Sequence, residues 1–209
     1  MTGAQLVSTL GFRLEDEAAS IYSSSVKLDA LNMAQKTVVS MIDNSYLTEL
    51  ETVKNDQALS SGAVSFSSAS IDPIRNGIIG IYDETNDKWC TFINPRDVHT
   101  LDSQYYSGTT SSPIAYIFSE TIYVKPTTVS TVDIWYLKSP TDLADDSTEC
   151  ELNPALQEAV LDFAEAQLFR ADGKIDRADM AYKTAAGSIS ALNQRVNVDA
   201  LNKVGSKGI

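Results

Sequence analysis

The last quarter of the chain contains the pattern that most constrains the fold, because it specifies two successive helices with a defined stop between them. Asn153 is a good N-cap, and Pro154 suits the first helical position, where a missing N–H costs nothing. Asp172-Gly173 supplies the left-handed residue that ends a helix. A second helical pattern follows almost at once and continues to Val196. A connection this short predicts an antiparallel helical hairpin.

Each of the two predicted helices carries one apolar face. The face of the first consists of Leu156, Ala159, Val160, Phe163, Ala164, Gln167 and Leu168. The second has the narrow seam by which one helix packs along another, with residues alternately three and four apart: Ile175, Ala178, Tyr182, Ala185, Ile189, Leu192 and Val196. The outer faces, which we expect to meet water or a neighbouring subunit, include Glu158, Asp162, Glu165, Lys174, Arg177 and Lys183. This pattern predicts architecture and carries no chemistry.

The charge of the chain narrows the classes of protein to consider. The 28 acidic and 16 basic residues give a net charge of −12, which argues against general nucleic-acid binding because phosphate contacts need clustered Lys and Arg. A solubilising surface explains this charge, and so does an acidic lumen around DNA that must not stick. The run of about 18 apolar residues that a membrane span requires is absent. The N-terminus lacks the basic residues of a secretory signal, so we expect folding in a cytoplasm.

The N-terminal part of the chain has helical spacing of uneven strength. Apolar residues four apart within residues 2–14 predict a short helix that is interrupted at Gly11. A stronger helix is predicted over residues 26–43. From residue 46 to residue 61 the pattern weakens to one or two helical turns.

From residue 63 the pattern changes to that of β-strands. Short runs rich in β-branched and aromatic residues alternate with turn residues such as Ser119-Glu120 and Lys125-Pro126. Spacings this short favour antiparallel hairpins over parallel crossovers. The predicted strands lie in Ala63–Phe66, Gly77–Tyr82, Trp89–Ile93, Ile114–Phe118, Thr121–Val124 and Thr131–Leu137.

Together these patterns predict an α+β fold. The N-terminal helix and the C-terminal antiparallel helical hairpin form a helical bundle, and a central antiparallel β-rich insert and an extended C-terminal tail complete the chain. We expect one compact domain with four parts: residues 1–62 are helical, 63–140 form the β-rich insert, 141–196 contain an acidic loop and the helical hairpin, and 197–209 form the tail.

The residue patterns that support catalysis, metal binding or cofactor binding are missing. The single histidine, His99, lies far in sequence from Cys90 and Cys150, so a Ser-His-Asp or Cys-His arrangement is not supported, and we expect two free, buried or half-buried thiols. The segment 83–87 lacks the glycine and the terminal glutamate of an EF-hand and is interpreted as a turn. Gly77-Ile78-Ile79-Gly80 is not a phosphate-binding loop. We predict no catalytic residue, no cofactor and no metal; an enzyme with paired carboxylates is the last alternative.

The aromatic residues leave a different function open. Most fall inside the predicted strands, where we expect core and rim residues. Trp135 and Tyr136 are neighbours in one strand, so their side chains point to opposite faces. A carbohydrate- or receptor-binding accessory module would require several aromatic residues on one exposed face, and it is kept as an alternative.

The composition of segment 197–209 predicts a C-terminal tail. Gly205 and Gly208 make it a poor independent element. It nevertheless carries four apolar residues, Val198, Leu201, Val204 and Ile209. Two interpretations stay open: a fraying terminus, or a tail that becomes ordered on a partner.

The order of these parts resembles the head-to-tail adaptor proteins of tailed bacteriophages, which are also called connector, head-completion or neck proteins. The resemblance covers most of the chain and is carried mainly by residues 122–192. Within them, the strand-turn-strand segment Ile122–Leu143 precedes the helical segment Leu152–Gly173. The resemblance is one of hydrophobic and turn positions and includes no catalytic signature.

The resemblance implies a structural virion protein. It would be a subunit of a homo-oligomeric ring, commonly of twelve copies, that docks under the portal protein, contacts tail or neck proteins, connects capsid to tail and lines the DNA exit channel. Genomic DNA would pass through the lumen without sequence-specific binding, and no membrane would be involved. The ring would be assembled in the host cytoplasm and reside in the virion neck. A neck stopper or tail-completion ring is the alternative within the same class.

The resemblance also implies a role for the tail. Adaptors of this kind have a C-terminal extension that reaches into the portal, and residues 197–209 match it in place and character. The candidate portal contacts are Val198, Leu201, Val204 and Ile209.

Overall fold

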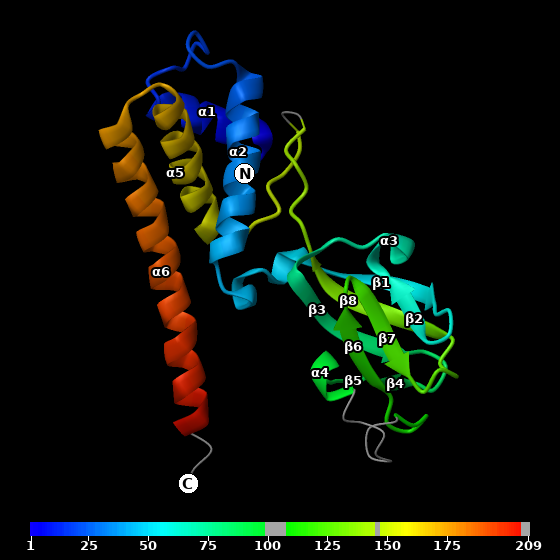
Figure 1. Cartoon of the computed structure of the whole chain (residues 1–209). Coiled ribbons are helices and arrows are strands. Elements are labelled where there is room, and N and C mark those ends of the chain that lie inside the picture. The colour runs from blue at the N-terminus through cyan, green and yellow to red at the C-terminus, as the bar shows by residue number, and fades with distance from the viewer. Residues whose placement is uncertain (99–107, 145–146, 206–209) are drawn as a thin grey trace. The chain divides into compact units, whose positions relative to one another are not determined.

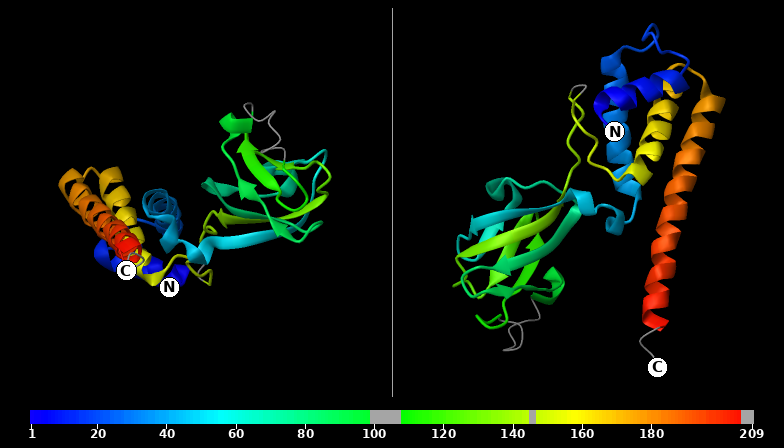
Figure 2. Two further views of the ribbon diagram at one scale, coloured as in Figure 1. Left: turned by 90° about the horizontal axis from the view of Figure 1, so that it is seen from below. Right: turned by 180° about the vertical axis from the view of Figure 1, so that it is seen from behind.

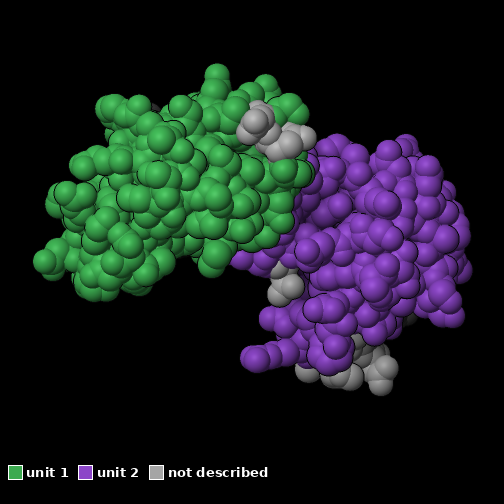
Figure 3. All heavy atoms as spheres, turned by 90° about the horizontal axis from the view of Figure 1, so that it is seen from above, with its two compact units in different colours: residues 1–50, 140–209 green, residues 51–139 purple. Residues whose placement is uncertain are grey.

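The chain divides into two compact units in the computed structural model, which describes residues 1–98, 108–144 and 147–205 (Figure 1). Unit 1 consists of residues 1–50 and 140–209, and unit 2 of residues 51–139 (Figure 3). Unit 1 is helical, whereas unit 2 contains the strands, so the predicted α+β class is confirmed. The sequence patterns instead predict one compact domain, with the β-rich part beginning at residue 63.

Unit 1 is built around its helix α5. Packing of α5 against α1, α2 and α6 explains why its buried residues occupy more than one face. In Figures 1 and 2, α5 and α6 run side by side in opposite directions. The elements of the unit are α1 (Gly3–Arg13), α2 (Ser24–Met41), the 3₁₀ turns η1 (Asn44–Tyr46) and η2 (Thr48–Leu50), α5 (Pro154–Ala171) and α6 (Ile175–Gly205).

The ends of the unit 1 helices follow the capping chemistry of the sequence. The Ser23 side chain accepts a hydrogen bond from the N–H of Val26 at the start of α2. Asn153 caps α5 by accepting from the N–H of Ala155 at 3.0 Å, and Pro154 occupies the first helical position, as predicted. After α5, Gly173 adopts a φ of 73°, the left-handed conformation that the sequence predicts there.

Gly11 does not interrupt α1, and the reason is local packing. The helix continues to Arg13, so the predicted break is wrong. A Cβ on Gly11 would lie 3.1 Å from Nζ of Lys27 and 3.2 Å from the carbonyl oxygen of Asp16. The glycine therefore makes room for a neighbouring side chain and the chain that follows the helix, and its backbone remains helical.

The segment 197–205 is a continuation of α6 and is not extended, so the predicted extended tail is wrong for these residues. The sequence from Val196 to Val204 contains no proline or glycine, and Gly205 is where the helix ends. Residues 206–209 lie outside the described residues.

Unit 2 consists of two four-stranded sheets that enclose one apolar core. The strand orders are β1-β8-β3-β4 and β2-β7-β6-β5. The core between them includes Ile81, Ile122, Val132 and Ile134. The elements of the unit are β1 (Glu51–Ala58), β2 (Ala63–Ser65), α3 (Phe66–Ala69), β3 (Pro73–Asp83), β4 (Lys88–Trp89), β5 (Thr91–Phe92), α4 (Pro95–Val98), β6 (Ile114–Phe118), β7 (Thr121–Lys125) and β8 (Thr131–Lys138).

Two features of unit 2 differ from the sequence prediction. The segment 51–58, predicted within the helical part, is strand β1, whose polar side chains are tolerated because it is an edge strand paired with β8 alone. The pairing of β5 with β6 is parallel, although antiparallel hairpins are predicted throughout. The long connection between these strands, which includes α4, is what permits a parallel pair.

Substitution of two glycines tests the backbone conformations in the α5–α6 connection and within α6. A Cβ added to Gly187, inside α6, or to Gly173 meets no atom within 4 Å, so only backbone conformation separates the two sites. We expect Gly187→Ala to raise the free energy of unfolding by about 0.5–1 kcal/mol and Gly173→Ala to lower it by about 1 kcal/mol. Urea denaturation of the monomeric protein measures both. Equal shifts of the same sign would contradict the helical and left-handed assignments.

Candidate functional site

A single arginine of α1 contacts three carboxylates of α5. The Arg13 guanidinium lies 2.6 Å from Oδ1 of Asp162 and 3.8 Å from Oε2 of Glu165, and it also pairs with Glu158. The side chains of Asp162 and Glu165 are only 16% and 20% exposed. The sequence pattern predicts these two residues on an outer face; that prediction is wrong, because Arg13 of α1 lies against them.

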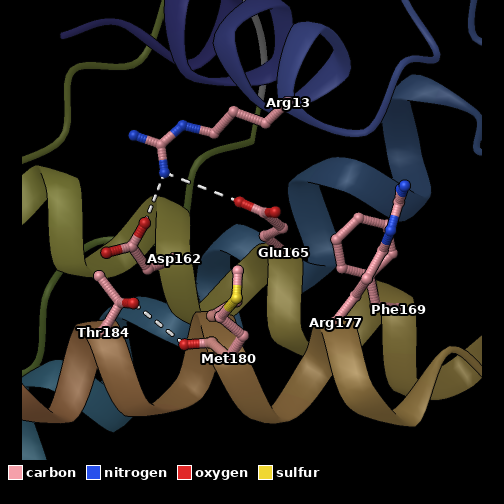
Figure 4. A pocket seen from close by; sticks show the side chains of 8 residues that line it. Arg13, Asp162, Glu165, Phe169, Arg177, Met180 and Thr184 are labelled. Atoms are coloured by element: carbon pink, nitrogen blue, oxygen red, sulfur yellow. Dashed lines mark hydrogen bonds and ion pairs between the residues drawn. The ribbon is translucent and has the colours of Figure 1, made fainter.

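These charges line part of a hollow of about 330 Å³ formed by residues of α1, α5 and α6 (Figure 4). Another part of its lining contains Phe169, with the Arg177 guanidinium carbon 5.6 Å from the ring centroid, and the exposed Met180. The Thr184 hydroxyl donates a hydrogen bond to the Met180 carbonyl oxygen within α6. The lining residues include no histidine, cysteine or tyrosine. This arrangement joins helices and offers no nucleophile with an adjacent base.

Burial dominates the electrostatics of this charge cluster. It raises the pKa of Asp162, and the hydrogen bond and charge of Arg13 only partly oppose that rise. Burial also raises the pKa of Glu165, again opposed by Arg13 and reinforced by the charge of Asp162. Since protonation is favoured in the folded state, these two carboxylates disfavour folding at neutral pH and do so less as the pH falls towards their ordinary pKa. Arg13 offsets this effect.

Replacing Arg13 tests that role. We expect Arg13→Gln to destabilise unit 1 by about 2 kcal/mol near neutral pH and by much less near pH 4, because the raised pKa values of Asp162 and Glu165 favour their protonated forms as the pH falls. Urea unfolding at the two pH values measures the difference. Arg170→Gln is the control, because Arg170 pairs with Asp179 through side chains that are 60% and 52% exposed. An equal loss for Arg13→Gln at both pH values would mean that this side chain acts by packing alone.

A second ion pair, Asp16 with Lys27, is buried within unit 1. The Lys27 ammonium lies 3.1 Å from Oδ2 of Asp16 and donates to the Asp16 carbonyl oxygen at 2.6 Å, and the side chains are 2% and 0% exposed. The N–H groups of Ile21 and Tyr22 donate to the Asp16 carboxylate, as does Ser20. These donors hold the pKa of Asp16 well below its usual range. The resulting stabilisation is complete above the ordinary carboxyl pKa and is lost as the pH falls towards the lowered value.

Lys27 and Lys36 form a matched pair for mutation. Lys27→Met leaves the buried Asp16 carboxylate without its cation, and we expect a loss of about 3 kcal/mol in the free energy of unfolding. Lys36→Met removes an ion pair with Asp142 whose side chains are 56% and 57% exposed, and we expect a change within about 0.5 kcal/mol. Chemical denaturation of both variants near neutral pH checks this difference. A small loss for Lys27→Met would show that the buried pair contributes little.

Side chains near residue 193 attach α6 to the end of α2. Asn193 donates from Nδ2 to the Met41 carbonyl oxygen at 3.0 Å and accepts at Oδ1 from the N–H of Asp43 at 2.8 Å. The Tyr46 hydroxyl donates to the carbonyl oxygen of Leu192 at 3.3 Å. The last carbonyls of a helix have no partner within it, so Asn193 both completes α2 and fixes the position of α6.

Elsewhere α6 is exposed around most of its perimeter. Between residues 175 and 195 its buried residues are Ala178, Ala181, Ala185 and Ile189. Ala178, Ala185 and Ile189 belong to the predicted seam, and their burial confirms the seam at these positions. Ile175 and Tyr182 of that seam are 50% and 43% exposed, although the Tyr182 ring still packs edge-on against Phe163 at 5.3 Å. Over residues 175–195 so narrow a buried stripe leaves a long surface of α6 for other molecules.

Three of the four candidate portal contacts belong to the last part of this helix. Val198, Leu201 and Val204 belong to α6, while Ile209 and the lone His99 lie outside the described residues. Their contact with a partner stays a prediction.

The two cysteines are free and buried, as predicted. Burial raises the pKa of Cys90 to about 12 and also raises that of Cys150, so neither is a reactive thiolate at neutral pH. Within residues 1–98, 108–144 and 147–205, no three His, Cys, Asp or Glu side chains are grouped so that they could hold a metal ion. None of the helices in that part of the chain is long and apolar enough to cross a membrane.

The sequence patterns do not single out Arg13, Lys27 or Asn193. The burial of Lys27 could have been predicted from its position in the sequence. It shares the helical spacing of the buried Leu31, Ala34 and Val38 and therefore lies on the apolar face of α2. No sequence pattern could have predicted the contacts of Arg13 and Asn193, since each bonds to a helix more than a hundred residues away in the chain.

Comparison with protein-family models decides the class of protein. The model described as SU10 adaptor protein matches residues 1–205. The chain belongs to this family. It is a family of phage head-to-tail adaptors, and the predicted resemblance is confirmed. No curated protein matches the chain.

Membership in the adaptor family indicates the general role of the protein. The family is structural and is not a family of enzymes. An adaptor is a virion component that interacts with other phage head and tail proteins. Since the match spans both units, the β-rich unit 2 is part of the family architecture.

Proposed function

We propose that the protein forms a ring, of twelve copies, that docks under the portal protein and connects the capsid to the tail. The observation that carries this proposal is the family match over residues 1–205. The surface of α6 supports it, because residues 175–195 have a narrow buried stripe and a long exposed surface in a single copy of the chain. Neighbouring subunits are the partners that such a surface suits best. A neck stopper or tail-completion ring is the alternative, and it would contact the tail instead of the portal.

The ring would surround the DNA exit channel without gripping the DNA. Charges along α6 nearly balance, with Asp176, Asp179 and Asp199 against Arg177, Lys183, Arg195 and Lys203. This helix by itself would make a nearly neutral wall, so the acidic lumen that the net charge of −12 suggests would need acidic residues of other parts of the chain. Weak phosphate attraction suits a channel through which DNA must slide.

The C-terminal segment 197–209 would contact the portal. It follows Asn193, whose side chain joins α6 to the end of α2, so removal of the segment leaves these two hydrogen bonds in place. The apolar residues Val198, Leu201 and Val204 recur three apart along α6. This spacing suits a helix that inserts into an apolar groove of the portal protein.

Truncation tests the function directly. We expect the full chain, mixed with the portal protein of the same phage, to form a complex whose native mass corresponds to twelve copies of this chain bound to one portal. A variant that ends at residue 196 should lose only the helical signal of residues 197–205, and it should lose portal binding by at least about tenfold. Native mass spectrometry measures both, and circular dichroism controls for folding.

The outcomes separate the alternatives. Full-strength binding by the truncated chain would overturn the role of the tail. A complex with tail proteins but none with the portal would assign the chain to the stopper or tail-completion class. A protein that stays monomeric with both would overturn the ring.

A further inference from the structure

The outer face of the sheet β1-β8-β3-β4 in unit 2 carries a cluster of three aromatic rings, of which the two tryptophans are exposed and the tyrosine is half-buried. Trp135 of β8 pairs with Gly80 of β3, and Tyr82 of β3 pairs with Trp89 of β4. Because side chains alternate along a strand, all three aromatic residues lie on one face. The ring centroids of Tyr82 and Trp89 are 5.2 Å apart, and those of Trp89 and Trp135 are 6.1 Å apart. Trp89 is 58% exposed and Trp135 is 39% exposed.

The position of the Trp89 ring is built into the sheet. A Cβ on Gly80 would lie 2.7 Å from Cζ3 of Trp89, so the ring rests directly on the β3 backbone at a place where only glycine leaves room. Tyr136, the neighbour of Trp135, points the other way and packs against the core. The inner face thus stabilises unit 2, whereas the two tryptophans on the outer face expose apolar surface to solvent.

Carboxylates accompany these rings. Asp133 lies on the same face, two residues from Trp135 and opposite Tyr82. It accepts a hydrogen bond at 2.9 Å from the N–H of Asp56, where the register of β1 shifts. Burial, a hydrogen bond with Asp56 and the charge of Asp133 raise the pKa of Glu84. In the described part of the chain no ion pair joins Asp56, Glu84 or Asp133 to a basic side chain.

We propose that this aromatic–acidic face (Tyr82, Trp89, Trp135, Asp133 and Glu84) binds a lysine- or arginine-bearing segment of a partner protein. Cations are attracted to the faces of tryptophan and tyrosine rings, and the neighbouring carboxylates supply the complementary charge. Trp89 is inclined by 66° to Tyr82 and by 55° to Trp135, so the rings do not form the flat platform on which a sugar chain stacks. A cationic side chain needs only one ring face and one carboxylate. The proposal concerns unit 2 alone and does not depend on ring formation.

The chain contains a built-in reporter for this face. Its two tryptophans, Trp89 and Trp135, both lie there, so intrinsic tryptophan fluorescence reports on this face alone. We expect hexa-arginine to change the fluorescence of the full chain in a saturable way, with an affinity that weakens steeply as salt is added. Hexaglutamate should produce no change.

Matched variants distinguish this face from the general negative charge of the protein. Trp89→Ala and Asp133→Asn should each weaken hexa-arginine binding about fivefold by isothermal titration calorimetry. Phe118→Ala and Glu120→Gln should leave the affinity unchanged, because Phe118, 62% exposed, and Glu120 belong to the other sheet and its turn. Circular dichroism confirms that each variant is folded, and the conservative Asp133→Asn keeps the test valid where Trp89→Ala does not fold.

Three results would overturn the proposal. The first is the absence of saturable binding by hexa-arginine. The second is an equal loss in Glu120→Gln and Asp133→Asn, which would mean attraction to overall charge. The third is a fluorescence response to a neutral oligosaccharide such as cellohexaose without a response to hexa-arginine, which would assign the face to glycans.

Discussion

Burial of α5 on several sides is the constraint on which the rest of unit 1 depends. Leu156, Val160 and Phe163 are at most 2% exposed, and they need α1, α2 and α6 around them to remain so. Each full burial of such a side chain contributes about 1.5–3 kcal/mol, which exceeds what any surface ion pair in the unit supplies. The polar contacts then fix how the helices and loops of unit 1 lie against one another. Arg13 sets α1 against α5, Lys27 fixes the loop before α2, and Asn193 joins α6 to the end of α2.

The two units present different surfaces because their cores differ in kind. In unit 1 the described side chains of the last helix, residues 175–195, contribute little beyond an alanine-rich stripe to the core, so most of their surface is free for assembly. In unit 2 the core lies between two sheets, and the outer face of one sheet holds Trp89 and Trp135 where they add nothing to that core. An adaptor must meet several partners, and one chain here offers a helical surface and a separate aromatic–acidic one.

Local chemistry explains which elements the sequence predicted well. Asn153 and Pro154 start α5, and Gly173 ends it, because capping and left-handed turns depend on adjacent residues only. Five of the six strand-forming runs became single strands, whereas Trp89–Ile93 forms two short strands, β4 and β5, that belong to different sheets. Strand β1 was missed because its polar residues have no strand signal of their own; pairing with β8 makes it a strand. The tail beyond Val196 was predicted to be extended, although its lack of early glycine or proline allows α6 to continue.

By itself the sequence determined the fold class, the helix caps, the free cysteines and the resemblance to phage adaptors, since these rest on residue type and short-range spacing. Tertiary structure alone decided the sites. Arg13 meets Asp162 across 149 residues and Asn193 meets Met41 across 152, and no periodicity encodes such a meeting. Likewise, Trp89 and Trp135 become neighbours only because β4 and β8 flank β3, where Gly80 leaves room for a ring. Contacts distant in sequence follow from how elements pack, and packing is set by the whole core.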